Sequence, residues 1–274
     1  MRKKRKRNNR IQHLLKIICL ELVVIVLLLL CFVYILPRNP VSEIILDFIE
    51  EKPLVVLDAG HGGYDVGSEF NGVYEKNITL EITKKVGEEL ERRDIPVTYT
   101  RDSDHVDWPS DELQDLEERV HISNTSGASL FISIHTNATE TKDGQGFEIW
   151  AKTSDEQTEK LAENIEQEVV TLPYITDRGI KDEQTSPLHV LHYNELPAVL
   201  IEAGFLESKE DCEYLLVEEK QTEFAKEIAD GIENTLKDMG VKGSNASSWP
   251  GVRATWCCSG VQGPPGSNPS ANSL

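Results

Sequence analysis

The sequence predicts an α/β protein in which helices flank a layered, largely parallel sheet, preceded by one transmembrane helix. Between residues 53 and 240, short apolar runs alternate with longer segments whose apolar residues recur every three or four positions. Such alternation is typical of a parallel sheet that is covered on both faces. Before this body lies a stretch of 23 residues, Leu14–Leu36, that is apolar except for Lys16 and Glu21.

The N-terminal stretch predicts a signal anchor. At 1.5 Å per helical residue, Leu14–Leu36 would reach about 34 Å, which is enough for a bilayer core of about 30 Å. Seven basic residues precede Ile11, and by the positive-inside rule they place the N-terminus in the cytoplasm. Because no A-x-A-like site follows, an uncleaved anchor is favoured over a signal peptide. We therefore expect a single-pass protein of the cell membrane whose N-terminus is cytoplasmic and whose body is extracytoplasmic.

Composition divides the chain into four parts. Residues 1–36 are the basic head and anchor, 37–52 a linker, 53–240 the folded body, and 241–274 a disordered tail rich in Gly, Ser, Pro and Asn. The formal net charge is −19, and nine of the 28 basic residues fall within the first 40. The acidic body argues against nucleic-acid binding, which needs Lys and Arg to neutralise phosphates.

The first half of the body alternates strands and helices. Residues 54–57 are a continuous apolar run, typical of a strand buried on both faces. Residues 75–93 repeat an apolar side chain every four positions, as in a helix with one buried face. Residues 96–100 predict a second strand, 111–124 a second helix and 130–134 a third strand.

The second half continues the alternation. Residues 146–151 predict a fourth strand. Ser154 and Gln157 have the spacing of a capping box that opens a helix, which Pro173 ends. Residues 198–201 predict a further buried strand, and residues 222–239 a closing helix followed by Gly240 at the C-cap.

Three of these strands lead into chemically reactive side chains. The first runs through a short loop to His61, the third is followed by His135, and the late strand is followed by Glu202. Ligands of open α/β sheets bind beyond the carboxyl ends of the strands, so we expect these three residues at one edge. Glu75 begins the helix after the glycine-rich loop and can join them there.

Two histidines and one glutamate are the ligands of many catalytic zinc sites, in which water takes the fourth position. A second carboxylate outside the ligand set then moves the proton. Spacing alone leaves open which glutamate is the ligand. Each residue also has a structural alternative, since histidines after strands often serve as hydrogen-bonded structural residues and acids at helix starts balance the helix dipole. The other histidines are interpreted as structural or surface residues: His105, His121, His189 and His192.

Six motifs in order resemble the zinc-dependent N-acetylmuramoyl-L-alanine amidases of the amidase-3 family. They are VVLDAGHGGYDVGS at 55–68, YEKNITLEIT at 74–83, YTRDSD at 99–104, LEERVHISN at 116–124, FISIHTNA at 131–138 and PAVLIEAGFLES at 197–208. The resemblance covers about residues 53–240. It implies a twisted, mixed six-stranded sheet, one zinc ion per chain held by His61, Glu75 and His135, and Glu202 as the catalytic residue.

The resemblance also implies the reaction. The substrate would be the amide that joins the lactyl group of N-acetylmuramic acid to L-alanine in peptidoglycan. Glu202 would take a proton from water and return it to the leaving nitrogen, and Asp58 and Asp65 are candidates to orient the zinc-binding imidazoles. Two alternatives are a zinc peptidase acting on another wall peptide bond and a non-catalytic wall-binding module. Peptidoglycan and the membrane are the expected partners, and the need for an activator protein is left open.

Overall fold

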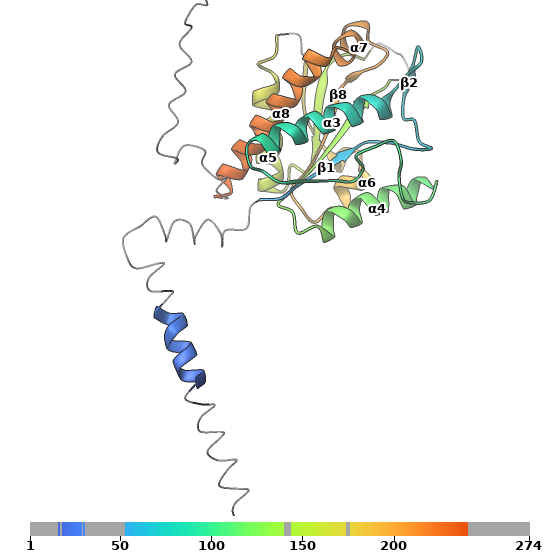
Figure 1. Ribbon diagram of the computed structural model, residues 1–274. Coiled ribbons are helices and arrows are strands. Elements are labelled where there is room, and N and C mark those ends of the chain that lie inside the picture. Colours follow the sequence, from blue (N-terminus) through green and yellow to red (C-terminus); the bar gives the residue numbers. More distant parts are fainter. Residues whose placement is uncertain are drawn as a thin grey trace, which may run out of the picture. The chain divides into compact units, whose positions relative to one another are not determined.

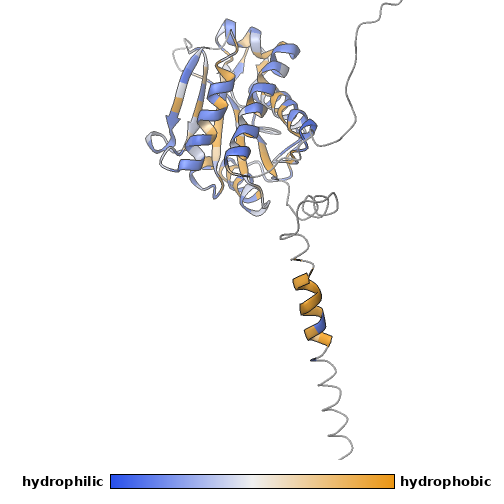
Figure 2. Cartoon of the chain, turned by 90° about the vertical axis from the view of Figure 1, so that its left-hand side faces the viewer, coloured by the Kyte–Doolittle hydropathy of each residue, from blue (hydrophilic) through white to orange (hydrophobic). Residues whose placement is uncertain are grey.

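The computed structural model describes residues 53–139, 144–173 and 176–240, together with residues 16, 18–28 and 30. The predicted linker (37–52) and tail (241–274) lie outside the described residues, and so does much of the predicted anchor. Residues 18–28 are helical and appear as an apolar segment in Figure 2. Within the described part of the chain, no helix is long and apolar enough to cross a membrane.

A mixed six-stranded sheet forms the centre of the body, as expected (Figure 1). Its strand order is β4-β1-β5-β8-β6-β7. The parallel strands are β4 (Val97–Tyr99), β1 (Val55–Ala59), β5 (Leu130–Asn137) and β8 (Ala198–Phe205). Strand β6 (Phe147–Ala151) runs antiparallel to β8, and β7 (Asp177–Asp182) runs parallel to β6. The carboxyl ends of β1, β5 and β8 therefore share an edge with the beginnings of β6 and β7.

Helices cover both faces of this sheet. One face packs against α3 (Glu75–Arg92), α5 (Glu156–Val169), α7 (Lys209–Leu215) and α8 (Glu218–Asp238). The other face packs against α4 (Glu112–Thr125) and the short α6 (His189–His192). Successive residues of β1 point to opposite faces, so Val55 and Leu57 join the larger apolar cluster while Val56 joins the smaller one. Burial of both faces explains why these strands are continuous apolar runs.

Two small elements complete the fold. A hairpin of β2 (Glu69–Phe70) and β3 (Val73–Tyr74) leads into α3, and the 3-10 turn η1 (Glu183–Thr185) follows β7. Figure 2 shows apolar residues along the strands and polar residues on the outer sides of the helices. The amphipathic helices thus bury one side only, as their sequence periodicity predicts.

Several boundaries differ from the sequence-based expectations. The capping-box interpretation of Ser154 was wrong: Asp155 is the N-cap of α5, and its side chain accepts a hydrogen bond from the backbone N–H of Thr158. Helix α8 begins at Glu218, earlier than expected, because its first turn is polar and lacks the apolar stripe. Strand β7 was not predicted, since an edge strand with the sequence DRGIKD shows no apolar pattern. Gly240 has φ +73°, as expected of a C-cap glycine.

Candidate metal centre

His61 lies just beyond β1 in a loop whose backbone carbonyls are held by two arginines. Its φ is +62°, a left-handed conformation that costs a non-glycine residue on the order of 1 kcal/mol. Arg119 donates to the carbonyls of Ala59 (2.8 Å) and His61 (2.7 Å). Arg101 donates to the carbonyls of Ala59 and Gly60, both at 2.9 Å. These charge-assisted hydrogen bonds stabilise the unusual backbone path.

A buried carboxylate, that of Asp58, holds Arg119 in place. It accepts hydrogen bonds from Arg119 (2.7 Å), Thr100 (2.6 Å) and Ser133 (2.6 Å). Burial alone would raise the pKa of Asp58, but the Arg119 guanidinium and the two hydroxyl donors lower it to about 2. The expectation that Asp58 orients an imidazole was wrong, because its partners are an arginine and two hydroxyl groups and no described histidine donates to it.

Asp65 lies where it was expected, beside His61. Its Oδ2 is 2.7 Å from His61 Nδ1, while Oδ1 accepts from the backbone N–H of Gly67 at 3.0 Å. A carboxylate at Nδ1 favours the tautomer that leaves the Nε2 lone pair free to bind a metal. Burial lowers the pKa of His61, but the carboxylates of Glu75 and Asp65 raise it to about 9.

Glu75 is the first residue of α3 and is nearly inaccessible to solvent, with 3% of its surface exposed. Backbone N–H groups hold both oxygens: Thr136 donates to Oε1 and Ser68 donates to Oε2, each at 2.8 Å. Burial would raise the pKa of Glu75, but hydrogen bonds and charge from His135 and His61 lower it strongly. The side chain is thus held ionised and pointing at the two imidazoles.

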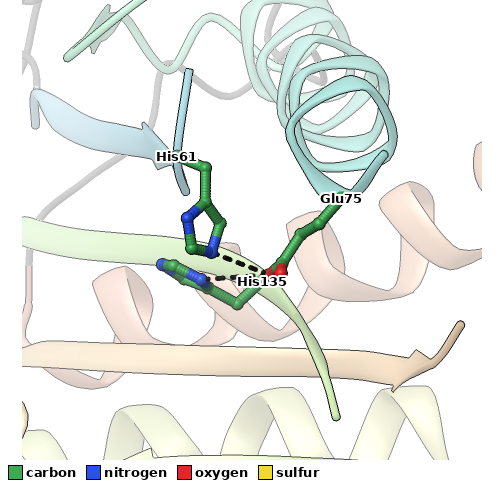
Figure 3. A group of neighbouring side chains, drawn as sticks. All are labelled: His61, Glu75 and His135. Atoms are coloured by element: carbon green, nitrogen blue, oxygen red, sulfur yellow. Dashed lines mark hydrogen bonds and ion pairs between the residues drawn. The ribbon is translucent and has the colours of Figure 1, made fainter. Parts of the chain in front are cut away.

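His61, Glu75 and His135 point toward one another from a loop, a helix start and a strand (Figure 3). Glu75 Oε1 is 3.2 Å from His61 Nε2 and 3.2 Å from His135 Nδ1. The three potential ligand atoms all lie within 4.8 Å of one another. The structure therefore brings together the three residues that the resemblance implied as metal ligands.

The local backbone leaves room for this group. A Cβ atom on Gly60 would lie 2.4 Å from the His135 imidazole, so a side chain there would push the ring away from Glu75. Two imidazole nitrogens and one carboxylate oxygen are donors that suit zinc, and they leave a coordination position for water. The donor set and the space around it therefore fit a catalytic divalent metal.

Glu202 lies next to this group in the sheet. The β5–β8 register pairs it with His135, and the β8–β6 register pairs it with Glu148. Its Oε2 is buried and has no hydrogen-bond partner among the described residues. Burial and the nearby charges of Glu75 and Glu148 raise the pKa of Glu202 to about 8. A carboxyl group that is easily protonated and has a free oxygen is suited to carrying a proton.

Glu148 is a site neighbour that sequence reasoning missed. It is buried, and it accepts hydrogen bonds from Asn137 (2.8 Å), Trp150 (3.0 Å) and Arg178 (2.8 Å). Glu148 does not follow the end of a strand, because β6 runs antiparallel to β8 and begins at the edge of the sheet where β8 ends. Its signal was an acid within an otherwise apolar strand.

The remaining described histidines lie outside the group. His105 is exposed and pairs with Asp107, and His121 is exposed on α4. His189 and His192 lie on α6 and contact the ring of Tyr193, which follows the helix. These positions agree with their interpretation as structural or surface residues.

Comparisons with known proteins agree with this geometry. Residues 55–234 match the Amidase_3 family, described as N-acetylmuramoyl-L-alanine amidase. The chain is 35% identical over 205 residues to an endolysin of Bacillus phage SPP1, covering 72% of this chain and 70% of the endolysin. Two solved structures are each 30% identical and cover 68% of this chain. They are an N-acetylmuramoyl-L-alanine amidase from Clostridium difficile 630 (97% covered, TM-score 0.62) and the CwlD amidase from Clostridioides difficile in complex with the GerS lipoprotein (100% covered, TM-score 0.63).

Proposed function

Because this chain belongs to the amidase-3 family of N-acetylmuramoyl-L-alanine amidases, we propose that His61, Glu75 and His135 hold one zinc ion and that Glu202 moves the proton in its reaction. The enzyme cleaves the amide between the lactyl group of N-acetylmuramic acid and L-alanine in peptidoglycan. One observation carries the proposal: three ligand atoms from distant parts of the chain lie within 4.8 Å of one another, beside a carboxylate with an unpartnered oxygen.

The chain's own residues divide the chemical work. When bound, zinc lowers the pKa of water from roughly 16 to about 7 and polarises a carbonyl oxygen. Asp65 orients the His61 ring, and the two backbone donors hold Glu75 in place. Glu202 takes a proton from the attacking water and gives it to the departing L-alanine nitrogen, so that the amine leaves as a neutral group.

The two glutamates should respond differently to substitution. Glu75→Ala removes a ligand, so zinc content and activity should both fall. Glu202→Gln keeps the size of the side chain but cannot accept a proton, so zinc content should stay near that of the wild type while hydrolysis falls by about 10²–10⁴-fold. Elemental analysis beside release of peptide from purified wall measures both quantities. Loss of zinc in Glu202→Gln and its retention in Glu75→Ala would reverse the assigned roles.

The identity of the new amino group tests the bond that is cut. Digestion of purified peptidoglycan should expose the amine of L-alanine, and chelation followed by zinc addition should abolish and then restore the release. A different amino-terminal residue would favour the peptidase alternative. Unchanged activity after complete removal of metal would contradict the assigned metal site.

We also propose that Leu14–Leu36 anchors the enzyme in the cell membrane with the body on the wall side. The support is the basic head, the apolar composition of this stretch and the helix that residues 18–28 form, since an apolar helix behind a basic segment is typical of a signal anchor. Protease added outside cells stripped of wall should digest the body and spare an N-terminal tag. Protection of the body would contradict this orientation.

Peptidoglycan is the substrate partner. The solved CwlD structure contains a lipoprotein, so a protein partner is a second candidate for this chain. Assaying the purified chain on purified wall, alone and with membrane extract, tests that candidate. Full activity of the chain alone would argue against a required activator.

A further inference from the structure

We propose that Arg178 binds the first free carboxylate of the stem peptide, and so selects substrates whose residue after L-alanine is acidic. This inference rests on the proposed function and deepens it. Arg178 lies at the start of β7, at the same edge of the sheet as the metal group. A row of side chains connects the two places, since His135, Glu202 and Glu148 are register partners across β5, β8 and β6. Arg178 Nε then donates to Glu148 Oε2 at 2.8 Å.

The guanidinium of Arg178 is held in place but retains unused donors. Its Cζ lies 5.0 Å from the centre of the Phe205 ring, and its Nε is occupied by Glu148. Nη1 makes one long contact of 3.5 Å with the carbonyl of Gln145, and no partner of Nη2 occurs among the described residues. The side chain is 37% exposed, whereas that of Glu148 is 5% exposed. The result is a pre-oriented fork with free N–H groups, which is the geometry that binds a carboxylate.

The other flank of the site has the opposite character. There the loop after β1 and helix α4 line a cavity of about 100 Å³. Three carboxylates face it, those of Asp65, Glu112 and Asp115, together with the ring of Tyr64. The arginine in its wall, Arg119, is buried and already paired with Asp58 and Asp115. An anionic ligand is repelled by this wall, while a neutral sugar with hydroxyl groups is not.

These two flanks orient the substrate. The scissile amide joins a neutral sugar carrying a lactyl group to a peptide whose residues beyond L-alanine carry free carboxylates. With the amide at the metal group, the anionic peptide extends along β8 and β6 toward Arg178, and the sugar lies toward Tyr64. The chain has a formal net charge of −19, so an exposed cation such as Arg178 beside the site strongly affects where an anionic peptide can bind.

The test uses full-length enzyme and two forms of purified peptidoglycan. In one form the D-glutamyl residue after L-alanine has a free α-carboxylate, and in the other this group is a carboxamide. The rate of amino-group release at low substrate concentration should be at least about 10-fold higher for the carboxylate form, the usual worth of a charged hydrogen bond. Arg178→Gln should lower the ratio of the rate on the carboxylate form to the rate on the carboxamide form by about 10-fold or more, to near 1. This ratio compares two substrates within one variant, so an effect of the unpaired Glu148 on the rate common to both forms does not enter it.

Three further variants separate binding from folding and from net charge. Lys152→Gln makes the same change in net charge beyond the C-terminal end of β6, at the opposite edge of the sheet, and should keep the preference. Arg178→Lys keeps the positive charge but lacks the planar guanidinium, so this variant should keep part of the preference for the carboxylate form. Arg178→Gln with Glu148→Gln removes both members of the ion pair, so it avoids an unpaired buried carboxylate and should again show no preference.

The outcomes are distinct. Equal cleavage of the two forms by the wild type, or a preference that survives in Arg178→Gln, overturns the role of Arg178. If the wild type exposes no new L-alanine amino group in either form, the proposed function itself is overturned. Loss of preference in Arg178→Gln and in the double variant, with retention in Lys152→Gln, supports the proposal.

Discussion

At the scale of single residues, a buried ion pair determines where His61 can lie. Arg119 connects the carboxylate of Asp58 to the carbonyls of Ala59 and His61. The imidazole is thus aimed by the path of its own backbone, and Asp65 then sets its tautomer. Three residues outside the ligand set, Asp58, Arg119 and Asp65, therefore position His61.

Arg119→Lys should weaken metal binding beyond its cost in stability. A lysine has one nitrogen and cannot reach Asp58 and both carbonyls together. We expect the melting temperature to fall and the zinc dissociation constant to rise by roughly 10-fold or more, the effect of losing outer contacts at a metal site. Competition with a chromogenic chelator measures the affinity, and calorimetry measures the melting temperature.

Arg93→Lys is the matched control. Arg93 pairs with Asp230 and Glu233 on α8, away from the metal group. This change should alter the melting temperature slightly and leave zinc affinity unchanged. Unchanged zinc affinity in Arg119→Lys would mean that the loop keeps its conformation without the arginine.

At the scale of elements, the close approach of α5 and α8 depends on a glycine. A Cβ atom on Gly231 would lie 2.5 Å from the Cα of Ile165 and 2.8 Å from the carbonyl oxygen of Asn164. Both obstacles are backbone atoms, which cannot rotate away. The absence of a side chain at Gly231 thus lets α8 pack against α5 and cover the larger apolar cluster.

Gly231→Ala should therefore destabilise the protein although alanine is the better helix former. The gain in helix propensity is about 1 kcal/mol, whereas forcing two packed helices apart costs about 1–3 kcal/mol or more. Urea denaturation should show a lower midpoint. The exposed Thr222 on the same helix provides a control, since Thr222→Ala should change stability by no more than about 0.5 kcal/mol. A higher urea midpoint for Gly231→Ala would show that α5 and α8 can move apart without a loss of stability.

At the scale of the whole molecule, the described apolar core lies within the body. Both apolar clusters and the residues packed against them lie between Leu54 and Met239. The structure describes a single free cysteine in the body, Cys212, so its stability comes from packing. Among the residues that the structure describes, none outside 54–239 belongs to either cluster.

Removing residues 241–274 should consequently leave melting temperature and specific activity nearly unchanged. The comparison is between purified fragments 53–274 and 53–240. A third fragment that ends at residue 217 should fail to fold, because it lacks Phe224, Ile228 and Ile232, which are completely buried. A large loss of stability in fragment 53–240 would indicate that the tail packs on the body.

Local patterns in the sequence were sufficient for most of the fold. The four-residue spacing from Ile78 to Leu90 predicts α3 because one turn of helix brings such residues onto one face. The positions of His61, His135 and Glu202 at one edge were predictable because parallel strands end on the same side of a sheet. The resemblance then implied Glu75 as the third metal ligand, and the structure brings it against both imidazoles.

Other features depended on the tertiary structure. The reversed direction of β6 follows from strand pairing between distant segments. This direction places Glu148 and Arg178 at the edge of the sheet that carries His61, Glu75 and His135. No local pattern encodes such pairing, and the polar edge strand β7 shows no apolar signal at all. Spacing likewise left the two glutamates equivalent. Their difference appears only in three dimensions, where Glu75 is held by backbone donors between two histidines and Glu202 keeps a buried oxygen without a partner among the described residues.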